Sequence, residues 1–203
     1  MIVAAVAGGL EPLICVNKRD LVDSELLRAQ FAVYRQWFRA LFTSAALAAQ
    51  AGPEGLGEPE QDDGIAGLAA ALKDRRSVLC GPSGVGKPSL LNAVAPGLGL
   101  RVSEVGAVAH KGRHTTSSIT LLELPFGGWV ADTAGLRQFA FWEVAPDQVS
   151  AGFPDLAPYL GRCQYPNCSH RGEQGCAVRV EVRTGAADAG RLRSYLQLVG
   201  GST

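Results

Sequence analysis

A glycine-rich turn between an apolar strand and a helix constrains this chain more than any other feature. Residues 77–80 have the apolar character of a buried strand. The turn that follows consists of Gly81, Pro82, Ser83, Gly84, Val85, Gly86 and Lys87. Its glycines allow backbone N–H groups to curve around phosphate oxygens, the next helix adds its N-terminal dipole, and Lys87 adds a positive charge. The sequence therefore predicts a phosphate-binding loop in an α/β fold, rather than an ordinary glycine-rich turn.

The residue after Lys87 departs from the usual pattern of such loops. That position normally carries a serine or threonine whose hydroxyl binds Mg²⁺, but here it is Pro88. Proline suits the first turn of a helix because its φ angle is fixed. It nevertheless removes a magnesium ligand and a backbone donor, and Ser89 lies one residue too late to replace the hydroxyl. We expect weaker nucleotide binding and slower turnover as a result.

A second motif near the N-terminus predicts which base is bound. The apolar run 12–16 has the profile of a buried strand, and it ends in Asn17, Lys18, Arg19 and Asp20. The Asp20 carboxylate can accept hydrogen bonds from N1–H and the exocyclic amino group of guanine, which adenine does not offer. Asn17 can bond the opposite edge of the base, and the Lys18 stem can lie along its face. These residues favour a guanine site and argue against a P-loop ATPase or kinase.

Three further segments complete the predicted nucleotide site. Ser44 and Ala45 follow a strand that includes Leu41, and there a backbone N–H can reach the guanine oxygen. Asp132 lies at the end of another strand, where it can hold magnesium through water, and the Gly135 N–H can reach the γ-phosphate.

A loop before that strand offers hydroxyl groups to the metal, from either Thr115 or Thr116. The base-reading motif precedes the phosphate loop in the chain, whereas in ordinary GTPases it follows. The motif order is therefore circularly permuted, and the segment after Gly135 leads directly into a cysteine cluster.

That cluster offers three thiolates and one imidazole from a short stretch, namely Cys163, Cys168, His170 and Cys176. Four such ligands suffice for a closed tetrahedral zinc site, which leaves no position for water or substrate. The sequence predicts a structural zinc ion that folds a segment poor in apolar residues. Reduced thiols and a loop disulfide are the alternatives.

The alternation of predicted strands and helices indicates a mainly parallel α/β sheet. We expect helices from residue 23 or 24 to about 39 and over 65–73, and adjacent strands over 119–124 and 129–131. The pattern changes after about residue 146, which predicts a GTPase domain over 1–145 and a small helical, zinc-binding subdomain over 146–203.

Composition and charge argue against several kinds of partner and location. The formal net charge is zero, so there is no overall basic footprint for nucleic acid or an anionic membrane. The apolar N-terminal stretch is too short to span a bilayer and lacks the charge of a secretory signal. The two cysteines outside the cluster, Cys15 and Cys80, stand in apolar runs and are predicted to be buried reduced thiols. We expect a cytoplasmic protein with no membrane partner.

Together these motifs resemble the RsgA (YjeQ) family of bacterial circularly permuted GTPases, which depend on the small ribosomal subunit. The resemblance rests on residues 16–21, 81–92, 112–116, 132–139 and 163–195. It implies a three-layer α/β/α P-loop GTPase fold and a small zinc-binding subdomain. It also implies GTP or GDP with Mg²⁺, one structural Zn²⁺, and a monomer that binds the small ribosomal subunit and its rRNA during late maturation.

The resemblance also implies roles for particular residues. Leu136 stands where many GTPases carry a water-orienting glutamine. The family therefore suggests His114 as the catalytic candidate, acting with Lys87 and Thr116. Because Pro88 replaces the family's serine, the alternative is a guanine-nucleotide-binding protein with little or no turnover.

A second departure concerns the N-terminus. Such proteins carry an OB-fold RNA-binding domain and one more strand ahead of the segment that matches here, whereas residues 1–10 resemble the helix just before the base-reading strand. We expect the OB-fold domain and that strand to be absent, through a fragment, a misassigned start codon or supply by another chain. A sheet lacking a strand has an unpaired edge, and ribosome binding is expected to be weaker.

Overall fold

The structure, a computed structural model, describes residues 1–51, 64–100, 120–132 and 144–200. They fall into two compact units. The larger unit comprises residues 13–32 and 39–139, and the smaller comprises residues 1–12, 33–38 and 140–203. This division differs from the expected contiguous ranges 1–145 and 146–203, because the first helix and residues 33–38 group with the C-terminal segment.

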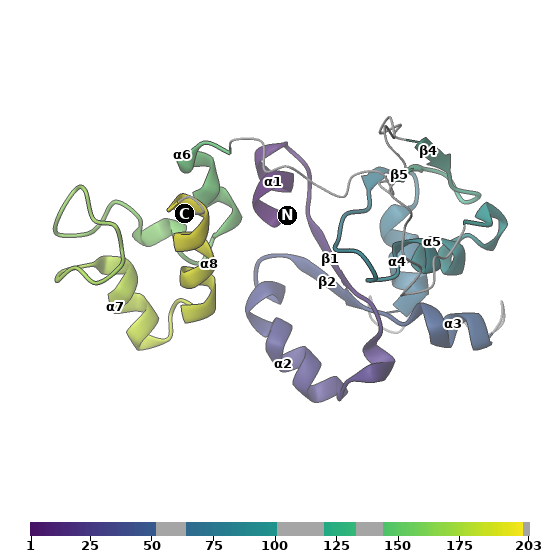
Figure 1. Ribbon diagram of the computed structural model, residues 1–203, viewed down its shortest axis with the longest axis horizontal. Coiled ribbons are helices and arrows are strands. Elements are labelled where there is room, and N and C mark those ends of the chain that lie inside the picture. Colours follow the sequence, from purple (N-terminus) through teal and green to yellow (C-terminus); the bar gives the residue numbers. More distant parts are fainter. Residues whose placement is uncertain (52–63, 101–119, 133–143, 201–203) are drawn as a thin grey trace, which may run out of the picture. The chain divides into compact units, whose positions relative to one another are not determined.

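The larger unit carries two β-sheets in the part of the chain that the structure describes (Figure 1). In the two-stranded sheet, β1 (Leu13–Val16) runs parallel to β2 (Arg39–Phe42). In the three-stranded sheet, β5 (Trp129–Asp132) lies between β3 (Arg76–Val78), which is parallel to it, and β4 (Thr120–Glu123), which is antiparallel. The expected pairing of neighbouring strands around residues 119–131 is thereby confirmed.

Four α-helices of the larger unit are described: α2 (Ser24–Arg35), α3 (Ala45–Ala51), α4 (Gly64–Leu72) and α5 (Lys87–Val94). Short 3₁₀ turns follow β1 and α5, η1 (Arg19–Leu21) and η3 (Pro96–Leu98). The apolar core joins both sheets to α4 and α5 and includes Leu41, Leu68, Leu91, Leu124 and Val130. This core fixes the two strand ends from which the loops at the candidate site emerge.

Helix α2 ends earlier than expected. The sequence pattern predicts a helix to about residue 39, but α2 stops at Arg35 and the N–H groups of Trp37 and Phe38 both bond to the Tyr34 carbonyl. The next residues form β2, in which Leu41 and Phe42 are almost completely buried. Burial of these side chains in a strand outweighs the local preference for continued helix.

The two cysteines outside the cluster differ. Cys15 in β1 packs against the core, and burial raises the pKa of its thiol to about 12, as expected for an inert core thiol. The prediction for Cys80 is wrong, because Cys80 is exposed. Strand β3 ends at Val78, so Cys80 lies in the segment that leads into the glycine-rich loop rather than within the sheet.

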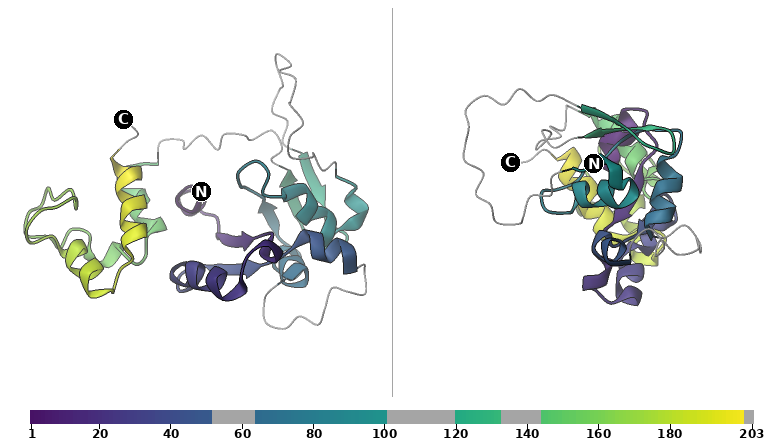
Figure 2. Two further views of the ribbon diagram at one scale, coloured as in Figure 1. Left: turned by 60° about the horizontal axis from the view of Figure 1, so that its bottom comes forward. Right: turned by 90° about the vertical axis from the view of Figure 1, so that its right-hand side faces the viewer.

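The smaller unit is helical in its described part (Figures 1 and 2). It contains α1 (Ile2–Ala7), α6 (Pro146–Val149), η4 (Ser150–Gly152), η5 (Ala157–Tyr159), α7 (Ala177–Thr184) and α8 (Ala189–Val199). Val3 packs so closely on Gly152 that a Cβ there would lie 2.5 Å from Val3 Cγ2. The core also contains Phe153, Leu156, Val178, Leu192 and Tyr195. Contacts such as Val3 on Gly152 explain why α1 belongs to this unit.

A buried ion pair lies in the core of the smaller unit. Arg191 Nη2 is 2.7 Å from Asp155 Oδ1, its Nε donates to the same oxygen at 2.8 Å, and Nη2 also donates to the Gly152 carbonyl at 3.1 Å. The guanidinium carbon lies 4.9 Å from the Phe153 ring centroid and 5.1 Å from that of Tyr34. Arg191 therefore ties residues 33–38 and 150–155 to α8.

Removing one partner of this ion pair should destabilise the smaller unit. We expect Asp155→Ala to lower the free energy of unfolding by about 3–5 kcal/mol, because it leaves a buried guanidinium without its counter-ion. Arg193→Ala, an exposed arginine of the same helix, is the matched control and should change stability by less than about 0.5 kcal/mol. Urea unfolding followed by circular dichroism measures both, and equal losses would contradict the assignment.

Candidate functional site

The predicted phosphate-binding loop lies between β3 and α5, as its sequence requires. Gly84 and Gly86 adopt φ angles of 79° and 88°, in the left-handed region that favours glycine. Gly86 is the N-cap of α5, and its carbonyl accepts the first intrahelical hydrogen bond from the Leu90 N–H at 2.9 Å. The loop therefore ends on the N-terminus of a helix, where backbone donors and the helix dipole favour an anion.

Lys87 is the cation of this loop. Its Nζ donates to the carbonyl oxygens of Gly81 at 2.7 Å and of Pro82 at 3.0 Å. The ammonium group is thus held beside the first two residues of the loop, although its Cα begins the helix. The positive charge of Lys87 therefore lies at the same loop, residues 81–87, as the N-terminus of α5.

Asn17 connects three segments that are distant in the sequence. Its Nδ2 donates to the Val85 carbonyl at 2.9 Å, and its Oδ1 accepts from the Ala45 N–H at 3.1 Å. A Cβ on Gly86 would lie 2.6 Å from Asn17 Nδ2, so glycine is required there by close approach as well as by its φ angle. Asn17 therefore braces the phosphate loop against the base-reading segments, a role that the sequence pattern does not reveal.

The sequence predicts that a backbone N–H of Ser44 or Ala45 reaches the guanine oxygen, and in this structure the Ala45 N–H donates to Asn17. Because an amide nitrogen carries two hydrogens, Asn17 Nδ2 keeps one donor besides the one bonded to Val85. The expected contact from Asn17 to the base is therefore compatible with its bracing role.

Lys18 also reaches the phosphate loop. Its backbone lies in the left-handed region, with φ of 63°, and its Nζ donates to the Gly84 carbonyl at 2.9 Å. The stem of Lys18 thus extends from the base-reading motif to the phosphate loop, along the path expected for a side chain that covers one face of a base. The left-handed backbone conformation of Lys18, directly after β1, directs its side chain towards the phosphate loop.

Asp20 is held by Ser44. The Ser44 hydroxyl donates to Asp20 Oδ1 and accepts from the Leu47 N–H at 3.2 Å, so it also caps α3. Ser44 is buried, whereas Asp20 is exposed and can present its carboxylate to a ligand. The sequence predicts a role for the backbone at residues 44–45, and the orienting hydroxyl is an addition that only the structure provides.

Two of the positions expected to bear on magnesium binding, Pro88 and Asp132, lie within the described residues. Pro88 lies in the first turn of α5 and offers neither an oxygen ligand nor an N–H group, so this position does not fit the metal. Asp132 ends β5, as expected. The other expected residues, His114, Thr115, Thr116 and Gly135, lie outside the described residues.

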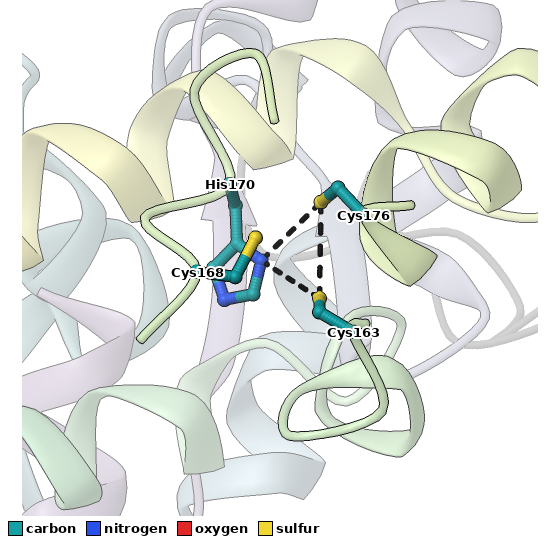
Figure 3. Close-up of side chains that lie close together, drawn as sticks. All are labelled: Cys163, Cys168, His170 and Cys176. Atoms are coloured by element: carbon teal, nitrogen blue, oxygen red, sulfur yellow. Dashed lines mark hydrogen bonds between the residues drawn. The ribbon is translucent and has the colours of Figure 1, made fainter. Parts of the chain in front are cut away.

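The four predicted metal ligands of the smaller unit come together in space (Figure 3). Their ligand atoms all lie within 4.8 Å of one another. His170 Nδ1 is 3.5 Å from the sulfur atoms of both Cys163 and Cys176, and these two sulfurs are 3.9 Å apart. A tetrahedral zinc site with bonds of about 2.3 Å to sulfur and about 2.0 Å to nitrogen requires S···S and S···N separations of about 3.8 and 3.5 Å.

Local structure positions these ligands. Cys176 is the buried N-cap of α7, and His170 adopts a left-handed φ of 61°. The Glu173 carboxylate accepts from the Ser169 N–H at 2.7 Å and from the Gly172 N–H at 2.9 Å, which fastens the turn between the ligands. All the cysteines are free thiols, so the alternative of a loop disulfide is not observed.

Two of the four ligands are shifted towards the protonation state that metal binding requires, whereas burial raises the pKa of the Cys168 thiol to about 12. Burial raises the pKa of the Cys163 thiol, but hydrogen bonds from the Ala177 and Val178 N–H groups and from the Cys168 thiol outweigh it, so the pKa is lowered overall. Burial lowers the pKa of His170, which favours its neutral imidazole. A thiolate and a neutral imidazole are the forms that bind metal.

Within the described residues, none of the helices combines the length and the apolar character needed to cross a bilayer.

Comparison with curated proteins gives relatives that share one description. The small ribosomal subunit biogenesis GTPase RsgA of Gemmatimonas aurantiaca is 40% identical over 97% of this chain and 60% of its own length. The protein of the same name from Moorella thermoacetica is 42% identical over 92% of this chain and 60% of its own length. The chain thus spans little more than half the length of the curated relatives that it matches.

Solved structures agree with this result. The crystal structure of YjeQ from Thermotoga maritima matches with a TM-score of 0.73 and 28% identity, over all of this chain and 64% of that one. YloQ, described as a circularly permuted GTPase, matches with a TM-score of 0.65 and 26% identity, over 98% of this chain and 59% of that one. The expected α/β fold with permuted motif order is thereby confirmed. The family described as RsgA GTPase matches residues 1–142, and the chain belongs to that family.

Proposed function

We propose that this chain binds guanine nucleotides and hydrolyses GTP in the maturation of the small ribosomal subunit. The observation that carries this proposal is the pair of hydrogen bonds formed by Asn17. They join the predicted base-reading motif to the phosphate loop at Val85 and to the start of α3 at Ala45. The relatives, which are named small ribosomal subunit biogenesis GTPases, support the ribosomal role. We place the protein in the cytoplasm, as a monomer that binds the subunit and its rRNA.

In this proposal the residues of the larger unit have separate tasks. The Asp20 carboxylate, oriented by Ser44, accepts hydrogen bonds from the guanine edge. Lys18 covers one face of the base. Lys87 and the N–H groups at the start of α5 bind the phosphates, with the loop residues Gly81, Ser83, Gly84, Val85, Gly86 and Ser89 around them. Together these contacts select guanine and hold its phosphates at one end of α5.

Further roles are proposed for residues that the sequence singles out. His114 is proposed to assist the attack of water, with Lys87 and Thr116. Asp132 and either Thr115 or Thr116 are the proposed magnesium contacts, and Gly135 is the proposed γ-phosphate contact. Because Pro88 cannot contribute to a metal site, we expect slow turnover.

In the smaller unit we propose that Cys163, Cys168, His170 and Cys176 bind one zinc ion. The separations among Cys163, His170 and Cys176 match those of a tetrahedral site, and Cys168 brings a fourth ligand atom within 4.8 Å of the others. A closed shell leaves no position for a substrate, so the ion has a structural role. It would join the turn at residues 163–176 to the N-terminus of α7.

The second candidate function is guanine-nucleotide binding with little or no turnover. Pro88 in the first turn of α5 favours it, because the position that normally supplies a metal ligand has no hydroxyl. The two candidates share the guanine site and differ only in catalysis.

Measuring phosphate release from GTP by the full chain, with and without purified small ribosomal subunits, separates the candidates. We expect turnover that rises when subunits are added and falls to background in Lys87→Ala. Binding of GDP without stimulated hydrolysis would favour the second candidate. A preference for ATP over GTP would overturn both.

A further inference from the structure

We propose that GDP binding by this chain is independent of Mg²⁺, and that Pro88 is the residue responsible. This inference rests on the proposed guanine site. It concerns how the phosphates are held, and it goes beyond the question of whether GTP is hydrolysed.

The first turn of α5 shows what Pro88 removes. An α-helix begins with four N–H groups that have no partner within the helix. In α5 these belong to the residues from Gly86 to Ser89, because the Leu90 N–H is the first to bond within the helix, to the Gly86 carbonyl at 2.9 Å. Proline has no N–H, so three backbone donors remain for a phosphate. It also has no hydroxyl, so the position has lost its usual link between the helix and a metal ion.

Ser89 does not replace the missing hydroxyl. Successive residues of an α-helix point about 100° apart around the axis, so Ser89 and Pro88 face different directions. A Cβ built on Gly86 would lie 4.0 Å from the Cβ of Ser89 and 2.6 Å from Asn17 Nδ2. The Ser89 side chain therefore lies next to Gly86. It does not point in the direction in which the side chain of residue 88 points.

Two lysine side chains, Lys87 and Lys18, supply positive charge at the phosphate loop. Lys87 Nζ is held at the carbonyl oxygens of Gly81 and Pro82, and Lys18 Nζ at that of Gly84, all within the phosphate loop. Two ammonium groups therefore contact the loop, and the N-terminus of α5 adds its partial positive charge. Ammonium groups and backbone N–H groups can compensate the charge of a diphosphate. Because they belong to the protein, they stay in place when Mg²⁺ is chelated.

The test measures GDP affinity of the full chain in excess MgCl₂ and in excess EDTA. We expect the dissociation constant of the unaltered protein to be the same in both. In Pro88→Ser, which restores the hydroxyl, EDTA should weaken binding about tenfold or more, the value of one strong contact to a charged group. Pro88→Thr provides the same test through a second variant should the serine variant fold poorly.

Two controls separate the hydroxyl from other effects of replacing proline. Pro88→Ala restores the N–H without the hydroxyl, so it should tighten GDP binding and remain insensitive to EDTA. Pro96→Ser makes the same replacement at an exposed proline beyond the other end of α5, and it should behave like the unaltered protein.

The outcomes also distinguish this inference from the function on which it rests. GDP binding that EDTA weakens as much in the unaltered protein as in Pro88→Ser would overturn the inference and leave the guanine site standing. Failure of the folded chain to bind GDP under either condition would overturn the proposed function and the inference with it.

Discussion

Replacing Asp20 with asparagine is expected to weaken GDP binding by about 10²- to 10⁴-fold, the combined value of two hydrogen bonds to a charged acceptor. The carboxylate accepts from both N1–H and the exocyclic amino group of guanine, whereas an amide places a donor against one of them. Because the amide oxygen of Asp20→Asn can still accept from the Ser44 hydroxyl, the side chain should stay oriented as Asp20 is now. The loss then reports on base recognition rather than on misplacement.

The same substitution should create a new preference. Xanthine carries a carbonyl oxygen where guanine carries its amino group, so the amide of Asp20→Asn can donate to it while accepting from N1–H. We therefore expect xanthosine diphosphate to bind the variant more tightly than GDP. Competition against a fluorescent nucleotide measures both affinities.

Asp23→Asn is the matched control for this prediction. Asp23 lies nearby in the chain, and its Oδ1 accepts from the N–H groups of Glu25 at 3.0 Å and Leu26 at 2.9 Å, a helix-capping role that asparagine also fulfils. This control should bind GDP like the unaltered protein. Equal GDP affinity in Asp20→Asn and Asp23→Asn would show that Asp20 does not read the base.

The second large effect concerns the metal cluster. Cys176→Ser is expected to reduce bound zinc from about one equivalent per chain to near zero and to unfold the smaller unit, because structural zinc contributes about 10–16 kcal/mol of apparent binding free energy to folding. Cys176 is 2% exposed and is the N-cap of α7, so loss of this ligand removes the metal contact at the start of that helix. Metal analysis and circular dichroism follow the two consequences.

Cys80→Ser provides the matched control, since Cys80 is an exposed thiol outside the cluster. It should retain zinc and helix content. Because Cys176 also packs in the core, Cys168→Ser supplies a second test at a less buried ligand. Retention of one zinc equivalent and unchanged helix content in both ligand variants would contradict the assignment.

The parts of the site that could be predicted are those whose chemistry is local. Cys163, Cys168, His170 and Cys176 lie close together in the chain and combine residue types that metals prefer, so proximity in space follows from proximity in sequence. The glycine-rich loop was likewise predictable, since a strand, glycines and a lysine in that order have few other uses.

The failures have a common cause. Helix α2 was expected to continue to about residue 39, and Cys80 was expected to be buried, yet both depend on where a strand begins or ends. The sequence of an apolar run does not show at which residue the strand ends. Strand length depends on pairing with a neighbouring strand that is distant in the sequence. Residues 1–12 and 33–38 group with the smaller unit through other contacts between distant segments, the packing of Val3 on Gly152 and of Arg191 on Tyr34.

The chemical groups of the site could be predicted from residue types and their order: a phosphate loop with proline at the metal position, Asp20 as the proposed guanine-reading carboxylate, and four potential metal ligands. How these groups are held depends on contacts between segments that are distant in the sequence. The hydrogen bonds of Asn17 to Val85 and Ala45, and of Ser44 to Asp20, join segments that the parallel pairing of β1 with β2 and the core beneath them bring together. Residue types specify which bonds are possible, but packing of distant segments selects the partners.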